Sequence, residues 1–190
     1  MSNRIVIIGA GSTNFGLGIV GDFFKSKILS GSTLVLHDIN PETLKNTYEI
    51  ALSYKEKLGV NFNIESTTSR SDALKKADFC LISIEVGNRF ELWEQDWKVP
   101  LQYGIKQVYG ENGGAGGLFH AMRQVPAIIK ICEDIEKICP EAFVFSYSNP
   151  MQRICHALNT RFPNLRITGL CHEIASMTRQ LPTPVSYTHL

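Results

Sequence analysis

The chain has 190 residues, of which 44% are hydrophobic, so it is long enough for one domain with a buried core. Its 19 basic and 18 acidic residues nearly balance, which argues against a nucleic-acid or anionic-membrane partner and favours a small molecule. No apolar run reaches the ~18 residues of a membrane span, and the first residues enter an apolar strand rather than a signal peptide, so we expect a cytoplasmic protein.

Short β-branched runs alternate along the chain with longer stretches of helical period, a pattern typical of an α/β fold. We expect a Rossmann-like, doubly wound parallel sheet with helices on both faces. The predicted strands are residues 4–8, 33–37, 62–66, 79–84, 143–146 and 166–170.

Helices are predicted after Gly11, over 41–58, near 71–76 and over about 118–139, with two more after Pro150 and Glu173. Pro126 lies inside the longest of these segments. Proline lacks the amide hydrogen that an interior helical position needs, so we expect a kink or a break there.

The cysteines form an odd set without a C-x-x-C pair: Cys80, Cys132, Cys139, Cys155 and Cys171. This argues against both a disulfide framework and a zinc knuckle, and indicates reduced thiols that mostly fill the core. Cys155 shares an apolar helical face with Ile154 and Leu158, so we interpret it as a core residue.

The strongest local motif is an apolar strand that runs into Gly9-Ala-Gly11-Ser12. Glycines let the backbone approach a pyrophosphate, and the N-terminus of the following helix supplies amide donors. We therefore predict that Gly9, Gly11 and Ser12 bind a dinucleotide. The usual third glycine is not in place, since Gly16 and Gly18 lie off position, and an ordinary strand-to-helix turn is the alternative.

Asp38 ends the second predicted strand. An acid at this place accepts hydrogen bonds from the adenosine ribose and repels a 2′-phosphate, which favours NAD over NADP. The alternative is that Asp38 caps the helix that begins near Pro41, because one side chain cannot easily do both.

Polar residues also follow the fifth and sixth predicted strands, at the edge of the sheet where ligands bind. Asn149, in Ser-Asn-Pro, is a candidate contact for the nicotinamide ribose or the substrate. Cys171 and His172 are candidates for metal ligand and proton donor. The alternative for Asn149 is that Asn-Pro simply starts a helix. The alternative for Cys171 and His172 is that they form a half-buried pair in a loop.

Residues 109–117 are rich in glycine. This composition indicates a loop that bends sharply against a ligand or moves over one, and a plain flexible linker is the alternative.

Taken together, these segments resemble the family 4 glycoside hydrolases, which use NAD. The resemblance rests on residues 9–12, 100–104, 110–117, 148–150 and 169–173. It implies that bound NAD transiently oxidises a sugar at C3, which acidifies the C2 proton and lets the glycosidic bond break by elimination before water adds. It also implies a divalent metal, usually manganese, that polarises the C2 and C3 oxygens.

The same resemblance implies roles for single residues. Cys171 matches a metal ligand, His172 matches the position that assists the leaving group, and Asn149 and Glu111 are assigned to substrate binding. Residues 171–174, Cys-His-Glu-Ile, look most like the subgroup that cleaves α-galacturonides. Leu92 stands where we align the phosphate-binding arginine of phosphoglucosidases, which favours an unphosphorylated sugar, although the nearby Arg89 keeps that question open.

The second half of such enzymes supplies a metal-binding histidine and the base near C2, and neither has a counterpart here. We therefore expect residues 1–181 to form a dinucleotide-binding domain without its α+β partner, inactive alone, from a protein that is a homo-oligomer at full length. Residues 182–190 look unrelated to the rest and are expected to be a non-native tail.

Two other functions compete. A lactate/malate-type dehydrogenase has a similar glycine start and Ser-Asn-Pro segment but needs an Asp-x-x-Arg pair, where this chain has Glu173 and Ser176. A non-catalytic NAD sensor would not need Cys171 and His172.

Overall fold

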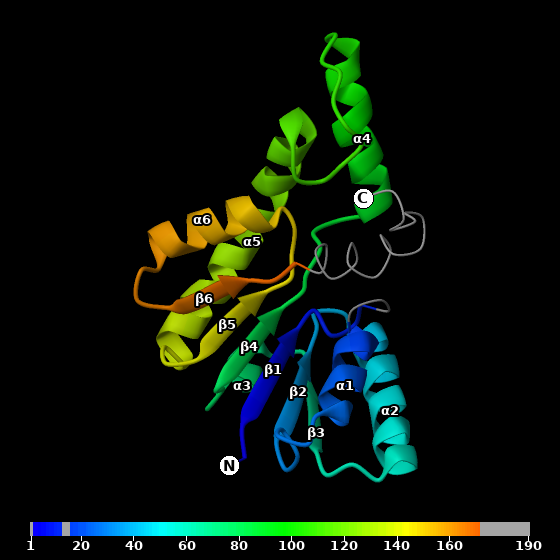
Figure 1. Ribbon diagram of the computed structural model, residues 1–190, viewed down its shortest axis with the longest axis vertical. Coiled ribbons are helices and arrows are strands. Elements are labelled where there is room, and N and C mark those ends of the chain that lie inside the picture. Colours follow the sequence, from blue (N-terminus) through cyan, green and yellow to red (C-terminus); the bar gives the residue numbers. More distant parts are fainter. Residues whose placement is uncertain (1, 13–15, 172–190) are drawn as a thin grey trace, which may run out of the picture.

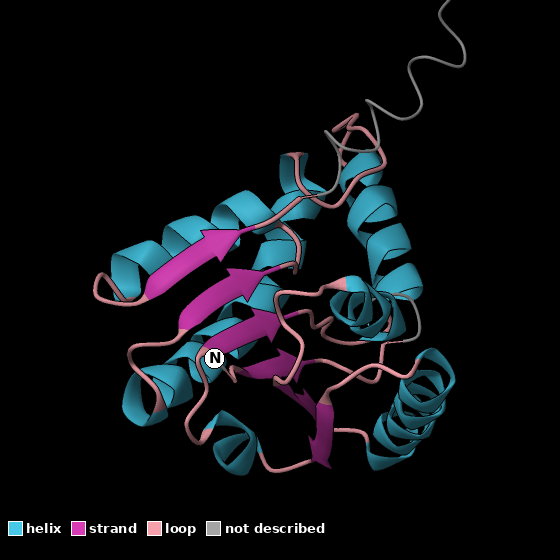
Figure 2. Cartoon of the chain, turned by 60° about the horizontal axis from the view of Figure 1, so that its bottom comes forward, coloured by secondary structure: helices cyan, strands magenta, loops and turns pink. Residues whose placement is uncertain are grey.

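The computed structural model describes residues 2–12 and 16–171, and these residues form a parallel sheet covered by helices. The strand order is β3-β2-β1-β4-β5-β6 (Figures 1 and 2). The bounds are β1 (Arg4–Ile8), β2 (Thr33–His37), β3 (Asn63–Thr67), β4 (Phe79–Ile82), β5 (Phe143–Ser146) and β6 (Arg166–Gly169). This is the predicted Rossmann-like fold, with the strand order of a doubly wound sheet.

Alternating side chains of the strands build two cores, one on each face of the sheet. Val6 and Ile8 of β1 belong to the cluster formed with α3 (Arg70–Leu74), α5 (Gly114–Ile138) and α6 (Met151–Arg161). Ile5 and Ile7 belong to the opposite cluster, formed with α1 (Gly16–Lys25) and α2 (Pro41–Leu58). Because both faces are covered, the central strands β1 and β4 are apolar except for Arg4 at the start of β1.

The crossover between the two halves of the sheet fixes where a ligand can bind. β1 pairs with β2 on one side and with β4 on the other, and Ile8 lies opposite both His37 and Ile82. The chain therefore leaves β1 and β4 in opposite directions at their carboxyl ends. Such a switch point opens a crevice in doubly wound sheets.

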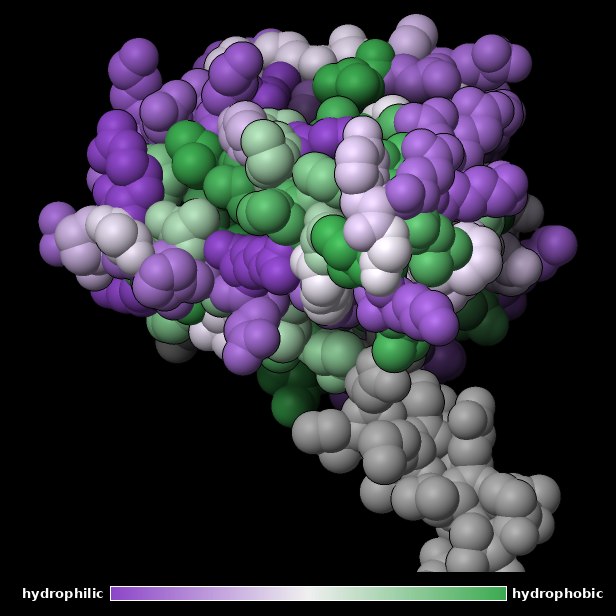
Figure 3. All heavy atoms as spheres, turned by 90° about the horizontal axis from the view of Figure 1, so that it is seen from above, coloured by the Kyte–Doolittle hydropathy of each residue, from purple (hydrophilic) through white to green (hydrophobic). Residues whose placement is uncertain are grey.

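Helix α4 (Arg89–Gln102) was not predicted from the sequence. It contains Pro100 and stands away from the sheet, packed against the start of α5 (Figure 1). Seen from the end of the molecule where α4 lies, the surface carries apolar side chains among hydrophilic ones (Figure 3). Exposed apolar and aromatic residues of α4 and the segment after it are Phe90, Val99, Leu101, Tyr103, Ile105, Val108 and Tyr109.

Helix α5 differs from its prediction at two points. It begins at Gly114 rather than near 118, and it continues through Pro126 to Ile138, so the predicted break is absent. The helix predicted after Glu173 and residues 182–190 lie outside the described residues. Among the described helices, none combines the length and apolar character that a membrane span requires.

Candidate functional site

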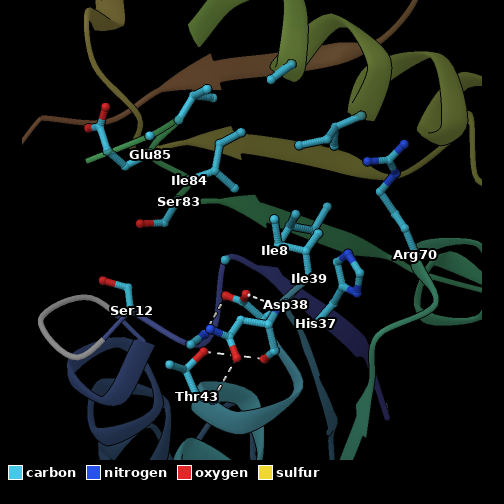
Figure 4. A pocket seen from close by; sticks show the side chains of 17 residues that line it. Ile8, Ser12, His37, Asp38, Ile39, Thr43, Arg70, Ser83, Ile84 and Glu85 are labelled. Atoms are coloured by element: carbon cyan, nitrogen blue, oxygen red, sulfur yellow. Dashed lines mark hydrogen bonds between the residues drawn. The ribbon is translucent and has the colours of Figure 1, made fainter. Parts of the chain in front are cut away.

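A pocket of about 540 Å³ opens at the carboxyl ends of β1, β2 and β4 (Figure 4). Its lining includes all four residues predicted to bind the cofactor, namely Gly9, Gly11, Ser12 and Asp38. It continues past the end of β4 to Glu85, Val86 and Gly87. The pocket therefore occupies the switch point of the sheet, the position of the dinucleotide in this class of fold.

The turn after β1 has no room for side chains at its glycines. Gly9 has φ +93°, and a Cβ there would lie 2.0 Å from the carbonyl oxygen of Ser83. A Cβ on Gly11 would lie 2.4 Å from Oγ1 of Thr43. Gly9 thus requires glycine, because its φ is positive and the clash is with the backbone, whereas a Cβ on Gly11 would displace the side chains of Thr43 and Asp38.

Gly16 corrects one sequence-based interpretation. It is the first residue of α1 and is buried, and a Cβ there would lie 2.1 Å from the carbonyl oxygen of Ala10. Close packing of the helix against the first turn is the role of the third glycine in dinucleotide-binding folds. Gly16 therefore takes that role despite its longer spacing, whereas Gly18 has open space around it.

Asp38 does not cap helix α2. Asn40 is the N-cap, and its Oδ1 accepts hydrogen bonds from the amides of Glu42 and Thr43. Asp38 Oδ2 instead accepts a 2.8 Å hydrogen bond from the amide of Gly11, and Oδ1 accepts one of 2.9 Å from the amide of Asn40. The carboxylate thus ties the glycine turn to β2 at the pocket wall.

Beside the far end of the pocket, in contact with Glu85, lies a buried histidine that was not predicted from the sequence. His120 of α5 is 5% exposed and bonds Oε1 of Glu85 through Nε2 at 3.0 Å. Gln124, one turn further along α5, donates to the same oxygen. Burial lowers the pKa of His120, but the hydrogen bond and the charge of Glu85 outweigh it and leave the pKa raised. The sequence signal for this region was Glu85, an acid three residues after the buried strand β4.

Glu111 and Asn149, both predicted to bind substrate, are in direct contact. Asn149 Nδ2 donates to Glu111 Oε1 at 2.6 Å. Arg89, at the start of α4, donates from Nη2 to both carboxylate oxygens of Glu111 at 3.1 and 3.0 Å. The structure therefore brings together the strand-end asparagine, the acid of the glycine-rich segment and the arginine whose role the sequence left open.

Arg89 also contacts an aromatic ring, which is part of a cluster of three. Its guanidinium lies 5.3 Å from the ring centroid of Trp93, and Trp93 stacks on Tyr109 at 4.9 Å. Trp97 packs edge-on against the same tyrosine. This arrangement fixes the side chain that orients Glu111.

The glycine-rich segment is mostly packed structure rather than a flexible linker. A Cβ on Gly116 would lie 2.8 Å from the carbonyl oxygen of Asp96 in α4, and one on Gly117 would lie 2.6 Å from that of Asn112. Arg123 of α5 also bonds both carboxylate oxygens of Asp96. Gly116 thus lets α5 approach α4 closely, and Gly117 lets it approach the preceding loop.

The two cysteines compared in the sequence occupy different surroundings. Cys171 is exposed and follows β6. Cys155 is half-buried, close to Gly169, and burial raises the pKa of its thiol. Ile154 and Leu158 are fully buried, so Cys155 lies at the margin of the core. His172 lies outside the described residues.

Cys171 and Asn149 follow neighbouring strands, β6 and β5, that end at the same edge of the sheet. Ser146, at the end of β5, pairs in register with Gly169, and its carbonyl accepts the amide of Leu170 at 2.9 Å. Ser148 then joins this region to β4 by bonding both the amide and the carbonyl of Ile84 at 2.9 Å.

The sheet order and the glycine-lined pocket define the class of protein, a Rossmann-like α/β fold with its ligand crevice at the switch point. The model of the family 4 glycosyl hydrolases matches residues 4–186, and the chain belongs to this family. The similarity to a malate dehydrogenase of Plasmodium falciparum, with a TM-score of 0.64 at 23% identity over 92% of this chain and 46% of that chain, reflects the fold alone.

Relatives within the family act on different sugars. An α-glucosidase of Erwinia rhapontici is 54% identical over 96% of this chain and 40% of its own length. An α-galacturonidase of Thermoanaerobacter italicus is 36% identical over 91% and 37%. The chain thus spans about 40% of the length of the relatives it matches.

A solved 6-phospho-α-glucosidase from gut microorganisms, in complex with NAD and Mn²⁺, superposes with a TM-score of 0.84 at 25% identity. The superposition covers 95% of this chain and 41% of the solved chain.

Proposed function

We propose that residues 1–181 form the NAD-binding part of a cytoplasmic enzyme that hydrolyses the O-glycosidic bond of an α-glycoside. The observation that carries this proposal is the position of Glu85. It lines the glycine-rich pocket and its carboxylate also lies within 4.8 Å of that of Glu111, the partner of Asn149. A dinucleotide pocket and a polar cluster suited to sugar hydroxyls thus adjoin in a chain of the family 4 glycosyl hydrolases.

The residues of the pocket fit NAD. Because Gly9 and Gly11 carry no side chains, their backbone can approach a pyrophosphate, and Ser12 lies beside them. Asp38, which lines the pocket, is assigned to the adenosine ribose, and its charge disfavours a 2′-phosphate. Arg70 also lines the pocket, but its Nε is engaged by Asp134 at 2.6 Å. When bound, NAD supplies the transient oxidation of the sugar at C3 that makes the C2 proton acidic enough for elimination.

The sugar is assigned to the edge formed by Glu111, Asn149 and the segment after β6. The carboxylate and carboxamide offer both acceptors and donors to sugar hydroxyls. We assign the metal-ligand role to Cys171 and proton donation to the leaving oxygen to His172. A divalent metal, which polarises the C2 and C3 oxygens, needs more donors than Cys171, so its complete site is a proposal for the whole protein.

The identity of the sugar has two candidates. Residues 171–174 predict an α-galacturonide, whereas the higher identity to the α-glucosidase, 54% against 36%, favours an α-glucoside. A phosphorylated sugar is disfavoured, because Arg89 is already paired with Glu111.

The test uses the full-length protein with NAD and Mn²⁺ on nitrophenyl α-glucoside and α-galacturonide. Turnover should require NAD, and the sugar released in D₂O should carry deuterium at C2, because elimination removes that proton. Turnover without NAD, or a product without deuterium at C2, would contradict the proposed mechanism.

A further inference from the structure

A compact charged cluster, formed by Glu85, Glu111 and His120, lies where the dinucleotide pocket meets the sugar edge. One oxygen or nitrogen atom from each of the three lies within 4.8 Å of the other two. Figure 4 shows Glu85 at the end of the pocket away from Thr43. A second, small cavity beside the pocket is lined by the same three residues together with Arg89, Trp93, Asp96 and Arg123.

The cations of this cavity are paired with carboxylates of the same cavity. Arg89 bonds Glu111, and Arg123 bonds Asp96, whose side chain is only 9% exposed. Three carboxylates, those of Glu85, Asp96 and Glu111, thus face two guanidinium groups and the imidazole of His120, which bonds Glu85. A guanidinium could bind an anionic ligand here only by leaving a partly buried carboxylate without its partner, which is costly.

Among the carboxylates that line this cavity, Glu85 pairs with His120 instead of with a guanidinium. Its side chain is 28% exposed, against 14% for Glu111, so it is the more accessible of the two. His120 and Gln124, both nearly inaccessible, donate to its Oε1. These contacts fix one oxygen, and no hydrogen bond to the other is found within the described residues.

We propose that Glu85 is a specificity-determining residue that selects an uncharged sugar. Its fixed carboxylate accepts hydrogen bonds from sugar hydroxyls and repels a phosphate or a carboxylate carried by the sugar. This inference rests on the proposed glycosidase function and narrows it. Phosphorylated and uronic α-glycosides become poor substrates, and neutral α-glycosides become good ones.

The same three residues resemble a ligand set for a cation, but their donors argue against that role. Arg89 bonds both oxygens of Glu111, and Gln124 and His120 share one oxygen of Glu85. A cation would have to displace a guanidinium. A titration of the full-length Glu85→Gln variant with Mn²⁺ should therefore match the wild type, and a loss of affinity would overturn the assignment of Glu85 to the sugar.

The main experiment compares two matched substrate pairs with the full-length enzyme. The pairs are nitrophenyl α-glucoside with its 6-phosphate, and nitrophenyl α-galactoside with the α-galacturonide. The wild type should prefer the uncharged member of each pair by at least about tenfold in kcat/KM. Glu85→Gln should reduce that preference by about tenfold, mainly through a lower KM for the charged member.

Salt dependence separates charge repulsion from a structural role of Glu85. Added salt should raise kcat/KM for the charged substrates of the wild type, because it screens the carboxylate, and should do so less in Glu85→Gln. Glu91→Gln is the control, because it removes a carboxylate from the exposed part of α4. It should leave both the preference and its salt dependence unchanged.

Two results would overturn the inference. One is a wild type that prefers the charged substrates, and the other is a Glu85→Gln variant with an unaltered preference and salt dependence. Binding of glucose and glucose 6-phosphate to the NAD-loaded protein, measured by calorimetry, provides a readout without turnover. If no substrate of either pair reacted, the glycosidase proposal would fail, while these affinities would still test Glu85.

Discussion

Asn149 and Glu111 are joined by a hydrogen bond of 2.6 Å although they stand 38 positions apart in the sequence. One residue follows strand β5, and the other lies between α4 and α5. Arg89 bonds the same carboxylate, so the pair is oriented before any ligand arrives. Residues that act as one unit should lose activity non-additively when they are replaced.

We expect Asn149→Ala and Glu111→Ala each to lower kcat/KM of the full-length enzyme. The double variant should lose less than the sum, with a coupling energy of about 1.5–3 kcal/mol, the range for a hydrogen bond to a charged group. Steady-state kinetics of the four proteins give the cycle. Purely additive losses would show that the contact has no part in substrate binding.

Substitutions of Asp38 should separate its two interactions. Asp38→Asn keeps an acceptor for the amide of Gly11 but removes the charge, so NADP should gain on NAD. Asp38→Ala also removes the acceptor, and binding of both cofactors should weaken, by about 1–3 kcal/mol for NAD. Calorimetry with each cofactor measures the affinities of the wild type and of both variants. If Asp38→Asn left the NAD to NADP ratio unchanged, the carboxylate would have no role at the ribose.

Gly16→Ala should destabilise the protein, because its Cβ would overlap the carbonyl oxygen of Ala10. The expected loss is about 1–3 kcal/mol in denaturant unfolding, together with weaker NAD binding. Gly18→Ala is the matched control in the same helix, where a Cβ has open space. It should be neutral or stabilise by up to about 1 kcal/mol, since alanine favours helix over glycine. Equal effects of the two substitutions would contradict the close-packing role of Gly16.

Cys171→Ser should impair metal binding in the full-length enzyme. A hydroxyl that stays protonated near neutral pH replaces a thiolate, so Mn²⁺ affinity and turnover should fall together by about 100-fold or more. Cys155→Ser places a polar atom at the half-buried contact with Gly169 and should cost about 1–3 kcal/mol of stability with near-normal turnover. Full manganese-dependent activity of Cys171→Ser would remove Cys171 from the metal site.

The pair formed by His120 and Glu85 should stabilise the fold most at low pH. The pKa of His120 is raised above its ordinary value of 6.5, so the folded state binds this proton more tightly than the unfolded state. The contribution is complete below pH 6.5 and is lost as the pH rises through the folded pKa. The difference in unfolding free energy between the wild type and His120→Gln should therefore shrink toward alkaline pH. A difference that grew instead would contradict the raised pKa.

The sequence predicted the sheet well, because its signals are local. Strands β1, β2 and β5 have the predicted bounds, and β3, β4 and β6 differ by at most two residues at either end. Helix α4 was missed, because Pro100 and a weakly periodic run hide it, and its stability depends on contacts with α5 such as Asp96 with Arg123. Gly16 was misjudged because spacing alone does not reveal how a helix enters the turn.

The residues of the candidate site show the same difference between local sequence signals and tertiary contacts. Residues that follow strands, such as Asp38 and Asn149, could be predicted from parallel topology. His120 could not, because it lies within a predicted helix and gains its partner, Glu85, only through tertiary packing. Neither could the engagement of Arg89 by Glu111, which needs the geometry of α4.

Labelling of the buried thiols can report on opening of the protein core. Cys80, Cys132 and Cys139 lie in the core between β4 and α5, at most 7% exposed. A thiol-reactive dye can reach them only when that core opens, so the rate of labelling at these cysteines measures the opening free energy under native conditions. Cys171, exposed at the sheet edge, should label from the folded state. Peptide mapping of the modified cysteines would then distinguish local events at the sugar edge from opening of the core, without any engineered probe.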